Sequence, residues 1–337
     1  MQLIYIGNIL QNKAISPTTI DTLSLKLREE GHVVKCFSDK KNVILRILNM
    51  CFGVIKNTNT KLVLIDTYST TAFWYSVLIS FLCKLLKKQY ILYLHGGNLP
   101  DRLDKNPKIC NWLFTKSYVN VAPSEYLKYE FERRGFNNIL LIPNSLEINN
   151  YTFSNRKPLE PKILWVRAFD KIYNPLLAVD VLVELHKKYP NAELCMVGPD
   201  KDGTLQQTKQ YAQKNNVDVV FTGKLSKKEW VKLSVKYNIF LNTTNFDNTP
   251  VSVIEAMALG LPVVSTNVGG LPFLIDNNDN GILVAPNNSI ALSTAIDELI
   301  KDPVKYNKLA INARLKAETF DWLEIRKSWN SLFNTIK

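Results

Sequence analysis

A regular alternation of short apolar runs with helical segments constrains this chain of 337 residues more than any other feature. Segments with helical spacing, such as 18–30 and 72–87, separate apolar runs of strand length. In the first half of the chain these runs are 2–7, 32–37, 61–66, 90–95, 118–121 and 138–142. Apolar strands that alternate with helices are typical of a parallel sheet covered on both faces. The pattern therefore predicts a doubly wound α/β fold.

The alternation breaks near residues 150–160 and then restarts. The polar segment 149–162 contains Pro158 and Pro161 and is the predicted linker. The later apolar runs are 163–166, 192–197, 217–221, 239–242, 262–266 and 281–284. We predict two Rossmann-like α/β domains, over residues 1–155 and 156–318, that face each other across a cleft. A C-terminal helix over 319–337 is expected to pack back on the first domain.

The charge of the chain favours an anionic partner. Lys and Arg number 42 against 30 Asp and Glu, a net charge of +12. Residues 1–150 carry 19 basic and 11 acidic side chains, a net of +8, whereas residues 251–300 contain no Lys or Arg. Basic residues do not alternate with aromatic ones, and no helix has the basic pattern of a DNA-reading element. We therefore expect a localised binding face and no nucleic-acid partner.

Cysteine, histidine and the first residues bear on location and metal binding. The chain has five cysteines without a CxxC pair and three histidines, so neither a disulfide framework nor a zinc site is indicated. The start, MQLIYIGNIL, lacks the basic region of a signal peptide. The longest uncharged run, 67–83, is shorter than the ~20 apolar residues of a membrane-spanning helix. We expect a cytoplasmic protein.

The segment 245–266 carries the clearest chemical pattern. Asp247 lies in a polar loop after an apolar run, and Pro250 marks the start of a helix that ends at Gly260. Glu255 is in the second turn of that helix. A carboxylate there can accept hydrogen bonds from sugar hydroxyls, and the free amides of the helix start can bind phosphate. The alternative interpretation is that Glu255 is an ordinary helix residue.

Asp247 and Glu255, with seven residues between them, resemble the Glu-x7-Glu element of the retaining glycosyltransferases of family 4, which have the GT-B fold. The sequence continues as EAMALGLPVVST and NVGGLP, as in that family, and departs from it by aspartate at the first acidic position. The resemblance implies that Glu255 binds the ribose of a nucleotide sugar. It implies that Asp247 faces the transferred sugar, with Asn248, Thr249 and Pro250 beside it.

Three further segments extend the resemblance in the second domain. ILWVRAF (163–169) is similar to the family's first strand there, so Arg167 is implied to neutralise the diphosphate, with Lys171 as a second cation. FTGKLSKKEW (221–230) implies that Gly223 lies near the nucleotide base. Fixed cations can stabilise a leaving nucleoside diphosphate, so no metal or other cofactor is expected. Asp200 and Asp202 form a DxD sequence, which we interpret as a turn.

In the first domain, LYLHGGNLP (92–100) is the strongest signal. His95 ends an apolar run, and Gly96 and Gly97 allow a ligand to approach the backbone. The resemblance places such a segment beside the donor sugar, where His95 would bind a sugar hydroxyl or assist deprotonation of the acceptor. The alternative is that His95 is a packing residue at a strand end.

The resemblance implies an enzyme that moves a sugar from a UDP- or GDP-sugar to a hydroxyl of a glycan or lipid-linked acceptor in bacterial surface polysaccharide synthesis. The first domain would then serve the acceptor and the second the nucleotide sugar. A nucleotide-sugar epimerase of similar fold and a noncatalytic phosphate-binding protein are the alternatives. A dehydrogenase is disfavoured because no GxGxxG follows the first apolar run.

Two apolar segments, 42–56 and 73–88, contain basic residues but no Asp or Glu. The simplest interpretation makes both of them core helices of the first domain. The alternative is an interfacial patch on anionic lipid, which would place the enzyme at the inner face of the plasma membrane.

Overall fold

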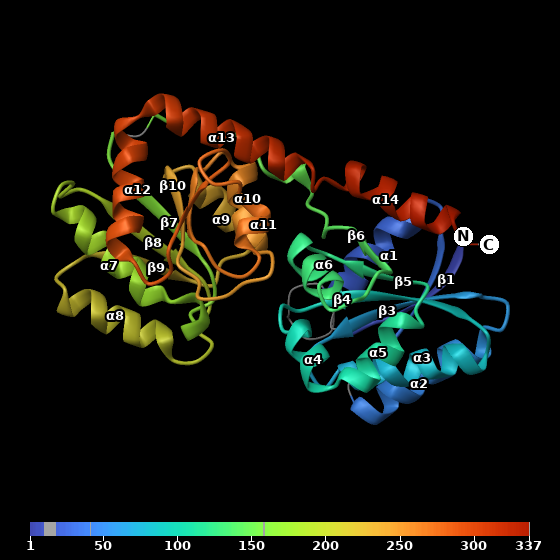
Figure 1. The fold of residues 1–337 in the computed structure, drawn as a ribbon. Helices are drawn as coiled ribbons and strands as arrows, with labels where there is room; N and C mark the ends of the chain where they lie inside the picture. Colours follow the sequence, from blue (N-terminus) through green and yellow to red (C-terminus); the bar gives the residue numbers. More distant parts are fainter. Residues whose placement is uncertain (10–17, 41, 158, 337) are drawn as a thin grey trace. The chain divides into compact units, whose positions relative to one another are not determined.

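A computed structural model describes residues 1–9, 18–40, 42–157 and 159–336, so Pro158 of the predicted linker lies outside the described residues. The chain divides into two compact units (Figure 1). Unit 1 comprises Met1–Pro143 and Trp329–Lys337, and unit 2 comprises Asn144–Ser328. Residues 144–155, expected in the first domain, thus belong to unit 2. None of the described helices combines the length and the apolar character required to cross a membrane.

Unit 1 is built on a parallel sheet of six strands in the order β2-β1-β3-β4-β5-β6. The strands are β1 (Gln2–Ile6), β2 (Val33–Phe37), β3 (Leu62–Tyr68), β4 (Gln89–His95), β5 (Val119–Ala122) and β6 (Ile139–Leu141). The helices are α1 (Thr19–Glu29), α2 (Val43–Lys56), α3 (Phe73–Leu85), α4 (Leu99–Lys105), α5 (Pro107–Thr115) and α6 (Glu125–Glu132). Strands buried on both faces, such as β3, explain the continuous apolar runs in the sequence.

Unit 2 repeats this plan with the strand order β12-β11-β10-β7-β8-β9. Its strands are β7 (Lys162–Val166), β8 (Glu193–Val197), β9 (Val219–Gly223), β10 (Ile239–Asn242), β11 (Val263–Thr266) and β12 (Ile282–Val284). Its helices are α7 (Pro175–His186), α8 (Thr204–Lys214), α9 (Lys227–Ser234), α10 (Val251–Ala258), α11 (Leu271–Leu274), α12 (Ser289–Lys301) and α13 (Pro303–Glu318), with the short 3-10 turns η2 (Ile148–Asn150) and η3 (Lys171–Tyr173). All paired strands are parallel, which confirms the predicted fold class.

The last helix, α14 (Trp322–Asn334), begins in unit 2 and ends in unit 1. Within unit 1 the indole ring of Trp329 packs edge-on against the ring of Tyr93, with 5.5 Å between the ring centroids. Asn330 Oδ1 lies 3.1 Å from His32 Nε2. The end of the chain is therefore part of the core of unit 1.

Candidate functional site

Arg167 and Asp247 meet where the strand order of the second sheet reverses. β7 and β10 are paired there, although β8 and β9 lie between them in the sequence. Ligands of doubly wound sheets bind at such a reversal, outside the carboxyl ends of the strands. Arg167 directly follows β7, and Asp247 lies in the loop after β10. Their side chains form an ion pair, and each is 15% exposed.

The guanidinium of Arg167 stays charged in its surroundings and can donate further hydrogen bonds. The guanidinium carbon lies 4.5 Å from the ring centroid of Tyr173, a cation–π contact. Burial lowers the pKa of Arg167 to about 10, and the interaction with Tyr173 opposes this shift only in part. The guanidinium is therefore charged at neutral pH. Within the described part of the chain, its Nε–H has no hydrogen-bond partner.

Two glycines support the loop that carries Asp247. The backbone N–H of Gly270 donates to the Asp247 carbonyl oxygen at 2.8 Å. A Cβ on Gly269 would overlap that carbonyl, and a Cβ on Gly270 would overlap the carbonyl of Asn248. Gly269 also has a φ of 54°, which side chains disfavour. The NVGGLP segment thus lets two loops approach each other at backbone distance and fixes the position of the carboxylate.

Glu255 presents a buried carboxylate on α10, with 4% of the residue exposed. The Tyr151 hydroxyl donates to its Oε1 at 2.7 Å, and Lys227 Nζ lies 2.8 Å from the same oxygen. Burial and the Glu255 charge raise the pKa of Tyr151, so this hydroxyl remains protonated and donates. The Lys227 side chain is 70% exposed and comes from the first residue of α9. Glu255 is therefore a positioned acceptor for hydroxyl groups.

The start of α10 has no side-chain cap over its first backbone N–H groups. Asn248 and Thr249 lead into the helix, and Pro250 is its N-cap residue without a side-chain cap. The first N–H groups of a helix have no partner within the helix, and its dipole favours an anion there. With Arg167 at the end of the neighbouring strand, this arrangement suits a phosphate group.

Lys171 is exposed and lies on the short turn η3, which is hydrogen-bonded to the loop that carries Asp247. Its carbonyl accepts from Asn245 Nδ2 at 3.3 Å, and its backbone N–H donates to Asp202 Oδ2 at 3.1 Å. Asp200 accepts from the backbone N–H of Gly203 at 3.0 Å. Both aspartates of the DxD sequence therefore stabilise the turn. Over the ranges that the structure describes, no group of three or more His, Cys, Asp or Glu is arranged to hold a metal.

Gly223 ends β9 with a φ of 71°. A Cβ at this position would meet no atom within 4 Å, so the preference for glycine is conformational. Its carbonyl accepts from the backbone N–H of Gly198 at 2.9 Å. Gly223 thus ends the strand with an open space around its Cα.

In unit 1 the strand order reverses between β1 and β3, and a buried carboxylate lies there. Asp66, fully buried near the end of β3, accepts from the Tyr5 hydroxyl at 2.9 Å. Its Oδ1 also lies 2.9 Å from His95 Nε2 at the end of β4. In the neutral imidazole, an Nε2–H that donates to this carboxylate leaves Nδ1 as an acceptor. A Cβ on Gly7, directly after β1, would overlap the Asp66 carboxylate.

Two tyrosine rings fix the imidazole of His95. The ring of Tyr68 stacks on it with 5.0 Å between centroids, and the ring of Tyr93 lies at 4.5 Å. Burial and the Asp66 charge raise the pKa of both tyrosines. Gly96, the next residue, has a φ of 92° and is exposed. The backbone thus turns directly after the tightly packed His95, and the positive φ of this turn favours glycine.

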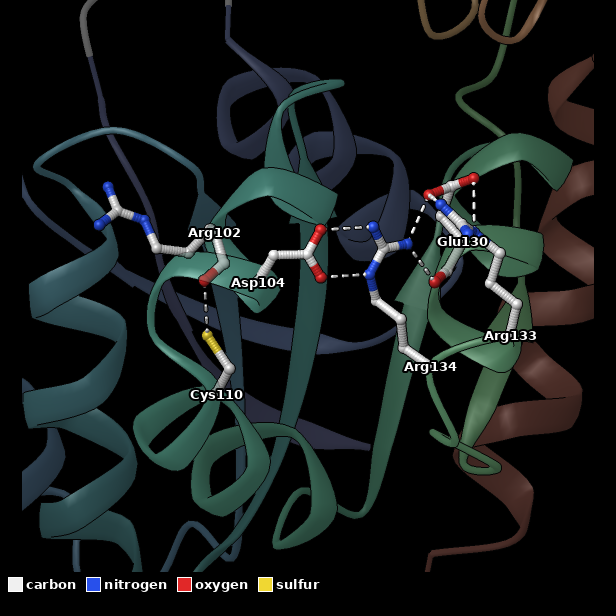
Figure 2. Close-up of polar contacts among 6 residues, drawn as sticks. All are labelled: Arg102, Asp104, Cys110, Glu130, Arg133 and Arg134. Carbon is white, nitrogen blue, oxygen red and sulfur yellow. Dashed lines mark hydrogen bonds and ion pairs between the residues drawn. The ribbon is translucent and has the colours of Figure 1, made fainter.

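An ion-pair network holds the helix that follows Gly96 and Gly97. Arg134, after α6, binds the Asp104 carboxylate of α4 with two hydrogen bonds of 2.8 and 2.7 Å (Figure 2). It also contacts Glu130, which accepts from Arg133. Bidentate arginine–carboxylate pairs fix orientation as well as distance. The network ties α4, and with it the end of the glycine turn, to α6.

The structure brings Arg167 and Asp247 together at the reversal point of unit 2, and it places His95, Gly96 and Gly97 in unit 1. The sequence analysis missed the polar partners of these residues, namely Asp66, Tyr151, Tyr173 and Lys227. A signal for Asp66 was present, because it is the only Asp or Glu between residues 40 and 100 and it lies within an apolar strand. Charged residues are rarely buried without a partner.

Comparisons with known proteins bear on the family and the fold of the chain. Residues 148–316, half of the chain, match the sequence model of the family "Glycosyl transferases group 1". The glycogen synthase of Mycobacterium tuberculosis (strain CDC 1551 / Oshkosh) is 26% identical over 253 residues, which are 72% of this chain and 60% of that protein. The chain thus spans less than two thirds of the length of this relative.

Solved structures share the fold over the whole chain. A sucrose-phosphate synthase from Thermosynechococcus elongatus has a TM-score of 0.79 at 17% identity, with 99% of this chain and 98% of that chain covered. Anabaena HepE, solved in complex with UDP and glucose, has a TM-score of 0.76 at 18% identity, with 100% of both chains covered. These likenesses concern the fold, and they support the two-domain GT-B class expected from the sequence.

Proposed function

Because the chain belongs to the group 1 glycosyltransferases, we propose that it transfers a sugar from a nucleotide sugar to an acceptor hydroxyl, with retention at the anomeric carbon. The observation that supports this most directly is the Arg167–Asp247 ion pair at the reversal point of unit 2. There, a guanidinium that can bind a phosphate contacts a carboxylate that can accept a hydrogen bond from a sugar hydroxyl. The buried carboxylate of Glu255 lies on the helix that follows.

We assign the donor's parts to these groups. Glu255 accepts hydrogen bonds from the ribose hydroxyls, and Gly223 leaves space near the base. The diphosphate lies against Arg167, Lys171 and the backbone around Asn248, Thr249 and Pro250. Asp247 accepts from a hydroxyl of the sugar. The donor then competes with Asp247 for Arg167, so binding of the diphosphate frees the carboxylate for the sugar.

The reaction breaks the bond between the anomeric carbon and the diphosphate oxygen and forms a bond to the acceptor oxygen. Negative charge develops on the leaving nucleoside diphosphate, and preorganised cations stabilise it without reorganisation. We propose that Arg167 and Lys171 fill this role without a metal. This proposal is supported by the carboxylates of the DxD sequence, which accept hydrogen bonds from backbone N–H groups.

His95 is proposed as the polar group of unit 1 that binds a hydroxyl of the sugar or accepts the proton of the acceptor. Asp66 would be a positioning residue, because it holds Nε2 and thereby leaves Nδ1 as the acceptor. A histidine fixed by a buried carboxylate and two aromatic rings has little freedom to misorient.

For the donor we propose a UDP- or GDP-sugar, and the fold likeness to Anabaena HepE, which was solved with UDP and glucose, favours UDP. For the acceptor we propose a glycan or lipid-linked precursor of a bacterial surface polysaccharide. The name of the M. tuberculosis relative, glycogen synthase, supports a glycan acceptor. We place the enzyme in the cytoplasm, at the inner face of the plasma membrane.

A thermal-denaturation panel with UDP, GDP, ADP, dTDP and CMP and their sugars tests the donor site, with EDTA or magnesium added in parallel. A ligand at ~100 times its Kd adds about 2.7 kcal/mol of stability. We expect one nucleotide to raise the Tm without metal, and the Glu255→Ala variant to lose this shift. Glu298→Ala, an exposed glutamate of the same unit, is the matched control. Loss of the shift in both variants, or in neither, would contradict the assignment.

Turnover then separates transfer from the alternatives. With the donor identified, release of nucleoside diphosphate should depend on an added acceptor. Conversion of the donor sugar without an acceptor would indicate an epimerase. Donor binding with no conversion under any condition would indicate a noncatalytic binding protein.

A further inference from the structure

Helix α2 presents a stripe of apolar side chains to solvent. Ile44, Leu48, Phe52 and Ile55 follow one another at helical spacing and are between 52% and 69% exposed. The opposite side of the helix contributes Met50 and Val54 to the core of unit 1. A surface helix normally turns polar side chains outward, and this one does not.

Helix α3 repeats this feature next to α2. Trp74, Leu78, Phe81 and Leu85 form its outward stripe and are between 38% and 69% exposed. The two helices pack against each other and against the same core. They lie with α5 along one side of the sheet of unit 1 (Figure 1). We call the two stripes together the α2–α3 face.

An apolar groove continues this face between α3 and α5. Its volume is about 640 Å³, and Trp74, Phe81 and Trp112 are among its lining residues. Lys108 is the one charged residue of its lining. Tryptophan side chains are favoured at the boundary between hydrocarbon and water, because the ring is apolar and the N–H is polar.

The charged residues on α2, α3 and α5 themselves are all basic. Between residues 40 and 100 the only Asp or Glu is the fully buried Asp66. Lys56, Lys84, Lys87 and Lys108 are exposed on or next to the three helices. Two further basic residues in this region serve the fold. Lys88 donates to backbone carbonyls within unit 1, and Arg46 donates to the carbonyl of Lys40.

We propose that the α2–α3 face docks on an anionic lipid bilayer, with its apolar stripes in the boundary between headgroups and acyl chains. Apolar area that enters this boundary and lysines that meet anionic headgroups act together in interfacial binding. A large exposed apolar surface marks an interaction site, and the surrounding lysines favour an anionic partner. The inference adds a contact surface to the proposed function and does not depend on the donor site.

Co-sedimentation of the full chain with lipid vesicles tests this. We expect binding to vesicles of phosphatidylcholine mixed with phosphatidylglycerol and at least about tenfold weaker binding to phosphatidylcholine alone. Raising the salt from about 0.01 M to about 1 M shortens the Debye length from ~30 Å to ~3 Å, so it should weaken the binding. Failure to bind anionic vesicles at low salt would overturn the proposal.

Paired variants locate the surface. Leu48→Gln combined with Phe52→Gln should lower the vesicle partition coefficient at least about tenfold. The matched control is Ile311→Gln with Leu315→Gln, which has the same spacing on α13 and similar exposure. Equal loss in both pairs, or no loss in the first, would contradict the assignment of the face.

Charge reversal gives a second test that does not change the apolar stripes. Lys84→Glu with Lys87→Glu should weaken binding by about tenfold or more, because each lysine near an anionic surface contributes roughly 1 kcal/mol. Lys209→Glu with Lys214→Glu, on α8, makes the same change in net charge as a control. Sedimentation velocity measures the oligomeric state of the protein. A dimer that dissociates in the Leu48→Gln and Phe52→Gln variant would assign the face to a second copy of the chain and overturn the proposal. The nucleotide-induced Tm shift of each variant reports on folding and on the donor site separately.

Discussion

The two strand-order reversals of the molecule occupy the same place in two similar sheets but hold different chemistry. In unit 2 the reversal carries a partly exposed arginine and aspartate, and the helix that follows starts without a side-chain cap. In unit 1 it carries a fully buried aspartate whose partners are a tyrosine and a histidine. The first arrangement can exchange its internal ion pair for an anionic ligand, whereas the second can only hold a neighbouring group in place. Position in the fold therefore selects where a site forms, and the local residues decide what it does.

The largest effect is expected from Asp247→Asn. The amide keeps the shape but loses the charge that pairs with Arg167 and accepts from the sugar, so kcat should fall by roughly 10²–10³. Binding of the nucleoside diphosphate should be unchanged or tighter, because Arg167 loses its competing carboxylate. Asp218→Asn, an exposed aspartate of unit 2, is the control. Steady-state kinetics together with calorimetry of nucleotide binding measure both effects, and weaker nucleotide binding would contradict the proposed competition.

Asp66→Asn tests the positioning role in unit 1 and should have a smaller effect. The neutral amide lacks the negative charge that favours a proton on His95 Nε2, so we expect kcat to fall by about tenfold to a hundredfold and its pH profile to shift. The Kd of the nucleotide should not change. Tyr5→Phe removes the other hydrogen bond to Asp66 and should leave the pH profile in place. A variant that loses stability but keeps the pH profile would show a purely structural role.

Matched glycine substitutions compare how tightly each reversal is packed. Gly270→Ala forces a Cβ onto the Asn248 carbonyl, and Gly7→Ala forces one onto the Asp66 carboxylate. Each should lower the free energy of unfolding by about 1–3 kcal/mol, as overpacking does. Gly203→Ala, which has open space around its Cβ, carries only the conformational cost of its positive φ. Urea denaturation measures the free energy of unfolding of each variant. Equal losses in all three would mean that backbone conformation, and not steric contact of the Cβ, determines the cost.

The smallest effect concerns a carboxylate remote from either reversal. Burial alone would raise the pKa of Asp297, but hydrogen bonds from Lys301, Lys188 and Tyr189 outweigh it and lower the pKa to about 2. The ion pairs therefore stabilise the protein above about pH 4, and this contribution disappears as the pH falls toward 2. Because the lysines are exposed, Asp297→Asn should cost under about 1 kcal/mol at neutral pH. Thermal denaturation of the native protein and of the variant at pH values between about 4 and 2 measures this contribution. The native protein should lose more stability over this range than the variant.

Local sequence patterns determined the elements and the family. The apolar runs predicted the twelve paired strands of the described chain. The signal is clearest for inner strands such as β3 and β10, because a strand buried on both faces is apolar throughout. The Asp247-to-Glu255 segment and its continuation led to the family that the sequence model confirms. The roles of the individual residues stay predictions, since they depend on a bound donor.

Only the tertiary structure decided which side chains face each other and which face water. Asp66 meets His95, and Tyr151 meets Glu255, through strand order and loop packing between residues far apart in the chain. Sequence periodicity carries no record of such pairs, because it reflects only which side of one element is buried. In α2 the periodicity does not identify the buried side, since apolar residues lie on both the inner and the outer side. The core of unit 1 buries the inner side, so the fold alone determined that the outer stripe stays exposed.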